Sequence, residues 1–83
     1  MENITEEIIK ILNFVKPQKE LYIEENFNTP LTGKMLFSSV DMVYVFLEIQ
    51  KHFNIKLGAE DLENYKFNSI NGIRDAVFNA SKF

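Results

Sequence analysis

The 83-residue chain contains no cysteine and no tryptophan, and only one histidine, two prolines and three glycines. Without cysteine there is no disulfide framework, no zinc finger and no thiol nucleophile within the chain. The single histidine, His52, argues against a histidine-rich metal site and a histidine-based catalytic triad. Gly33, Gly58 and Gly72 lie too far apart for a glycine-rich phosphate loop. We therefore expect neither a metal site nor an enzyme.

The net charge is small, and long hydrophobic stretches are absent from the sequence. The formal net charge is −3, whereas a protein that binds a nucleic-acid backbone needs a basic face, so we expect no nucleic acid as partner. No apolar run approaches the ~20 residues that span a bilayer, so we expect no membrane insertion. The acidic residues 2–7 differ from the basic start of a signal peptide, which favours a cytoplasmic location.

What the chain does contain is typical of a globular domain. Hydrophobic residues make up 46% and charged residues 25% of the chain, which includes eight phenylalanines. This length predicts a single domain over residues 1–83. Because a domain of this size has a thin core, nearly all of its apolar residues are needed for packing. A deep substrate cavity is therefore not expected.

Helical periodicity dominates the first part of the chain. Asn3 and Glu6 form a predicted capping box, and Pro17 is expected to end a helix over residues 4–16. The apolar residues at one-face spacing are Ile4, Ile8, Ile11, Leu12 and Val15. From Pro17 to Ser38 we expect a long loop with one short turn near Tyr22. Its expected apolar anchors are Phe27, Leu31, Met35, Leu36 and Phe37.

A second helix is predicted to begin after Ser38 or Ser39 and to end near Asn54. Its expected buried stripe is Met42, Phe46, Ile49 and Phe53, widened by Val43 and Leu47. Because this is the most apolar segment, we expect it to be the central helix. A short helix is predicted after Gly58, and Ser69 is expected to cap a last helix. The inward residues of that helix are Ile70, Ile73, Ala76 and Val77. No strand-like alternation appears, and the pattern predicts an all-α fold.

Two hydroxyl groups, those of Ser38 and Ser39, stand where the long loop meets the second helix. A helix N-terminus has free N–H groups and partial positive charge, so it suits a phosphate. Serine followed by Asp41 is also an ordinary capping arrangement. The residues by themselves leave both interpretations open and favour the plain cap. The pairs Glu6/Glu7 and Glu24/Glu25 are interpreted as solvated surface charge, and His52 as a surface or helix-end residue.

Several short motifs together resemble the acyl and peptidyl carrier proteins. They are SVDMV at 39–43, LEI at 47–49, FNIKL at 53–57, DLEN at 61–64 and FNSI at 67–70. The family pattern is Asp-Ser-Leu-Asp-x-Val at the start of the second helix, followed by an apolar helix ending in Glu-x-x-Phe-x-Ile-x-Ile. Leu31 and Met35 fall where the family has loop anchors. Ser38 stands where the family has aspartate, and Leu36 where it has glycine.

The resemblance implies a small four-helix bundle of the acyl-carrier-protein type, with three main helices, a short third helix and a long first loop. Ser39 would be the attachment point of phosphopantetheine, taken from coenzyme A by a phosphopantetheinyl transferase. The thiol of that arm would carry an acyl or aminoacyl thioester for a loading ligase and a downstream synthase or transferase. The expected docking residues are Ser38, Val40, Asp41, Met42 and Tyr44.

The outer face of the second helix is less acidic than the family pattern, because Tyr44, Gln50, Lys51 and His52 lie there. This favours a dedicated pathway, in secondary metabolism, aminoacyl loading or peptide modification, over housekeeping fatty-acid synthesis. A shuttle that visits several enzymes is expected to be a monomer. One alternative is a carrier-like module that is never modified and only binds other proteins, and another is an unrelated small helical domain.

Overall fold

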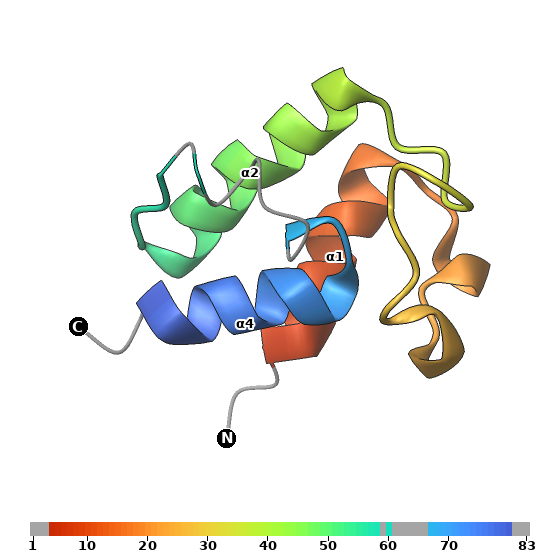
Figure 1. Ribbon diagram of the computed structural model, residues 1–83, viewed down its shortest axis with the longest axis horizontal. Coiled ribbons are helices and arrows are strands. Elements are labelled where there is room, and N and C mark those ends of the chain that lie inside the picture. Colours follow the sequence, from red (N-terminus) through yellow and green to blue (C-terminus); the bar gives the residue numbers. More distant parts are fainter. Residues whose placement is uncertain (1–3, 59, 61–66, 81–83) are drawn as a thin grey trace.

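The computed structural model describes residues 4–58, 60 and 67–80 (Figure 1). These residues form three α-helices and two 3-10 helices, and they contain no β-strand. The elements are α1 (Ile4–Val15), η1 (Lys19–Leu21), η2 (Glu24–Asn26), α2 (Ser39–Phe53) and α4 (Ile70–Ala80). The predicted all-α class is therefore confirmed for the described part of the chain. The short helix predicted after Gly58 and the capping residue Asn3 lie outside the described residues.

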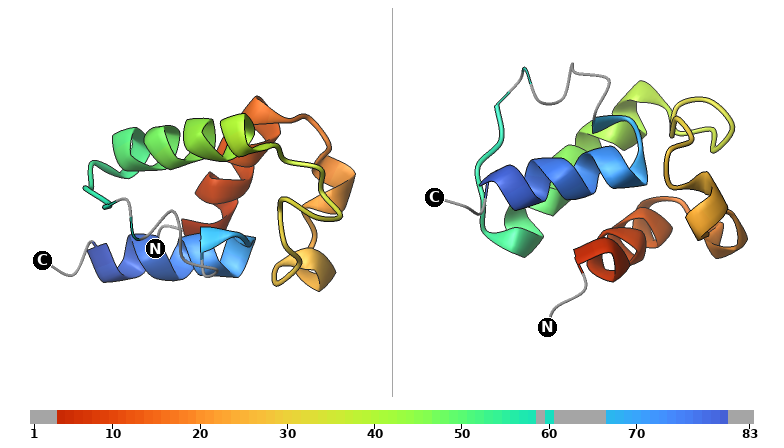
Figure 2. Two further views of the ribbon diagram at one scale, coloured as in Figure 1. Left: turned by 45° about the horizontal axis from the view of Figure 1, so that its top comes forward. Right: turned by 60° about the horizontal axis from the view of Figure 1, so that its bottom comes forward.

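The central element is α1, because both α2 and α4 pack against it (Figures 1 and 2). The prediction that the second helix is central was wrong. Ile8, Ile11 and Leu12 of α1 are buried, as their spacing predicts. The helix ends at Val15, two residues before Pro17, because proline disfavours the helical conformation in the residue that precedes it.

Helix α2 buries only part of its apolar surface. Its buried residues are Met42, Val45, Phe46 and Ile49, and Phe53 is half-buried. Val43 and Leu47 are exposed, so the prediction that they widen the buried stripe was wrong. Val45, which was not part of the predicted stripe, is buried instead of these two residues. Because α2 carries apolar residues on most of its circumference, its sequence does not by itself select the buried face.

The loop between η2 and α2 is pinned by buried side chains. Leu31, Met35 and Phe37 are buried, as expected, whereas Leu36 is exposed and is not an anchor. The N–H of Phe37 donates to the carbonyl of Leu31 at 2.9 Å, and the N–H of Leu31 donates to the carbonyl of Asn68 at 2.9 Å. The loop is thereby attached to the residues that precede α4, which fixes the point from which α2 starts.

Tyr22, between the two 3-10 helices, closes the end of α1. Its hydroxyl donates to the carbonyl of Lys16 at 2.7 Å. Its ring lies 6.4 Å from that of Phe37, measured between centroids. Burial raises the pKa of the Tyr22 hydroxyl above its ordinary value of 10.0. One side chain thus joins the last turn of α1 to the loop that leads into α2.

The predicted cap and core face of α4 are confirmed. The hydroxyl of Ser69 accepts a hydrogen bond from the N–H of Gly72 at 3.0 Å. Ile70, Ile73 and Val77 are buried. Within the described residues, no helix combines the length and the apolar character needed to cross a membrane.

We expect Tyr22→Phe to lower the free energy of unfolding by about 1 kcal/mol, because the Lys16 carbonyl loses its donor. Urea unfolding followed by circular dichroism measures the change. Tyr44→Phe is the matched control, because Tyr44 is exposed on α2. Equal effects of the two substitutions would contradict the role assigned to the Tyr22 hydroxyl.

Candidate functional site at the start of helix α2

A reciprocal pair of hydrogen bonds fixes the start of α2. Ser38 is the N-cap, with extended backbone dihedral angles (φ −83°, ψ 172°). Its hydroxyl accepts a bond from the N–H of Asp41 at 3.1 Å, and its own N–H donates to the Asp41 carboxylate at 3.0 Å. This capping box occupies the Ser38 hydroxyl and satisfies two backbone donors of the first turn. The interpretation as a plain cap is therefore correct for Ser38.

Ser39 has a different environment. It is the first residue of α2 and is exposed, and within the described part of the chain its side chain makes no hydrogen bond. Serine and threonine hydroxyls that face the start of a helix are ordinarily used as caps. Here Ser38 already supplies the cap, so the adjacent Ser39 hydroxyl is left accessible to solvent and to another molecule.

The helix end at Ser39 suits an attached anion. The N-terminus of α2 carries a partial positive charge. The ammonium of Lys16, at the end of α1, lies 3.9 Å from the Asp41 carboxylate. The pKa of Asp41 is held below its ordinary value of 3.8 chiefly by the hydrogen bond from the Ser38 N–H, with smaller contributions from the Ser38 hydroxyl and Lys16. Asp41 is thus committed to the cap and to Lys16.

The single histidine of the chain lies too far from Ser39 to act as a base for its hydroxyl. This histidine, His52, belongs to the last turn of α2. It lies roughly 20 Å from Ser39 along the helix axis, at 1.5 Å per residue. The arrangement therefore offers an exposed serine on which another molecule can act.

Leu36, three residues before Ser39, adopts an unusual backbone conformation. Its φ of 60° lies in the left-handed region, which costs a non-glycine residue about 1 kcal/mol. Its side chain is 71% exposed, so burial does not offset that cost. The N–H of Leu36 donates to the carbonyl of Gly33 at 3.0 Å, which closes the turn.

Exposed apolar side chains occur just before Ser39 in the sequence and continue after it along α2. We call this set the apolar face: Leu36, Val40, Val43, Tyr44 and Leu47. Four of its members lie on α2 at the spacing i, i+3, i+4 and i+7, which places them on one side of the helix. The most exposed member on α2 is Val40, at 72%.

The expected docking residues divide into two groups. Ser38, Val40 and Tyr44 are exposed, whereas Asp41 is half-buried in the cap. Met42 is only 7% exposed and packs in the core, so we remove it from the expected docking surface. Sequence reasoning missed Leu36, Val43 and Leu47, because it assigned all three to the core. For Val43 and Leu47, a signal was present in the sequence, because residues 40, 43, 44 and 47 are spaced to lie on one side of a helix.

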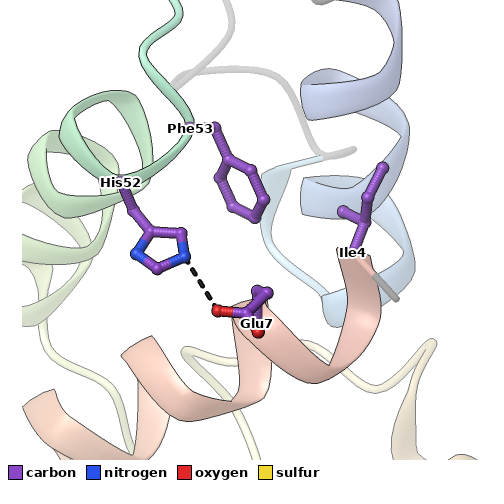
Figure 3. A pocket seen from close by; sticks show the side chains of 4 residues that line it. All are labelled: Ile4, Glu7, His52 and Phe53. Atoms are coloured by element: carbon purple, nitrogen blue, oxygen red, sulfur yellow. Dashed lines mark hydrogen bonds and ion pairs between the residues drawn. The ribbon is translucent and has the colours of Figure 1, made fainter. Parts of the chain in front are cut away.

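A second cluster lies at the other end of α2 (Figure 3). Ile4 and Glu7 of α1 and His52 and Phe53 of α2 line a hollow there. The Nε2 atom of His52 lies 2.9 Å from a carboxylate oxygen of Glu7. Hydrogen bonds from Lys10 and, to a smaller extent, from His52 lower the pKa of Glu7 below its ordinary value of 4.5. Glu7 is therefore paired, contrary to its interpretation as simple solvated charge, while His52 is at the surface as expected.

This second cluster joins two helices. Its lining includes one carboxylate and one imidazole, and the ammonium of Lys10 lies 3.2 Å from the Glu7 carboxylate. Among residues 4–58, 60 and 67–80, no group of three or more acidic, histidine or cysteine side chains is arranged to hold a metal ion.

Comparisons of the chain with protein family models, curated proteins and solved structures found no match. The resemblance to carrier proteins therefore stays a prediction.

We expect Ser38→Ala to lower the free energy of unfolding by about 1 kcal/mol, because it removes the N-cap oxygen. Ser39→Ala is the matched control and is expected to change stability by less than about 0.5 kcal/mol, because its side chain is exposed. Urea denaturation of both variants measures the difference. A larger loss for Ser39→Ala would show that the two hydroxyls have been assigned the wrong roles.

The Asp41 carboxyl makes stability depend on pH. Its pKa is lower in the native state than the ordinary value of 3.8, so its ionised form stabilises the fold above that value. This contribution disappears as the pH falls through the native pKa. Between about pH 5 and about pH 2.5, wild type should lose more stability than Asp41→Asn, as measured by urea unfolding at each pH. Identical pH profiles would refute this contribution.

Proposed function

We propose that the chain is a carrier protein that bears a phosphopantetheine arm on Ser39 and shuttles an acyl or aminoacyl group as a thioester. The observation that carries the proposal is the exposed Ser39 hydroxyl at the first residue of α2, next to a serine that already serves as the cap. The four-helix arrangement of the acyl-carrier-protein type belongs to the same proposal.

The conformation of Leu36 supports the resemblance at this site. Leu36 stands where the carrier pattern has glycine, and its φ of 60° is one that glycine adopts without steric cost. The backbone before Ser39 therefore suits the residue type of the family pattern, although the side chain differs. This agreement between backbone and pattern supports the alignment that places Ser39 at the modified position.

The chemistry asked of the site is modest. A separate phosphopantetheinyl transferase would remove the Ser39 proton, and the hydroxyl oxygen would attack the coenzyme A phosphate that bears pantetheine. A phosphoester bond to Ser39 forms, the pyrophosphate bond breaks, and the adenosine bisphosphate leaves. The start of α2 favours the resulting anion. The thiol that later forms the thioester belongs to the arm, which agrees with a chain that has no cysteine.

A loading ligase would then attach the cargo, and a synthase or transferase would accept it. The apolar face beside Ser39 supports a dedicated pathway, because the exposed positions of the first turns of α2 carry Val40, Val43 and Tyr44. Basic docking surfaces, such as those that recognise acidic carriers, would find few partners there.

A second candidate function is an unmodified module that binds other proteins. Two observations favour it: Ser38 replaces the aspartate of the carrier pattern, and apolar side chains are exposed on α2. Both candidates share the fold, so modification of Ser39 separates them.

The decisive experiment is to incubate the apo protein with coenzyme A and a promiscuous phosphopantetheinyl transferase and to measure the intact mass. We expect the addition of one phosphopantetheine group. Ser39→Ala should abolish the addition, and the matched variant Ser38→Ala should keep it. Because Ser38→Ala weakens the cap, its folding is checked by circular dichroism in parallel.

Each other outcome has a definite meaning. Addition that is lost in Ser38→Ala but kept in Ser39→Ala would move the site by one residue. No addition with several transferases, including one encoded near the gene, would overturn the carrier proposal in favour of the unmodified module.

A further inference from the structure

We draw no further inference here: the strongest candidate, the apolar face formed by Leu36 in the loop before α2 and by Val40, Val43, Tyr44 and Leu47 on the outer side of that helix, is exposed, but nothing in the structure shows what covers it.

Discussion

The capping box of Ser38 and Asp41 decides where α2 begins, and most other features of the site depend on that choice. Because the two residues satisfy each other, helix geometry starts at Ser39 and nowhere else in the serine pair. The same two bonds leave the Ser39 hydroxyl without a structural task.

The loop before α2 fixes the position at which this helix begins. Buried Met35 and Phe37 hold the chain on either side of Leu36, and Gln18 donates from its side chain to the Met35 carbonyl at 2.8 Å. Leu36 is thereby held outward between two anchors. At the far end of α2, the contact of Glu7 with His52 joins this helix to the start of α1. Helix α2 is thus held at both ends while its outer face stays uncovered.

Several helix boundaries follow from local signals that can be read in the sequence. Pro17 predicts the end of α1, Ser69 caps α4, and Asn54 ends α2 in a left-handed conformation. These signals act through the backbone of a few neighbouring residues, so they need no knowledge of the rest of the fold. The candidate site was located for the same reason, because two serines before an apolar helix mark its N-terminus.

Which apolar residues are buried depends on the tertiary structure. Helix α2 has apolar residues on both its inner and outer faces, and only packing against α1 selects Val45 for the core and leaves Leu47 outside. The sequence predicts Leu36 as an anchor, but in the structure it has a positive φ and its side chain is exposed. The sequence by itself therefore determined approximately where α1 and α2 end and where α4 begins. It placed the start of α2 only after Ser38 or Ser39, and the structure assigned the cap to Ser38 and left Ser39 available. Which apolar residues are buried was decided by long-range packing, because burial depends on neighbours that are distant in the chain.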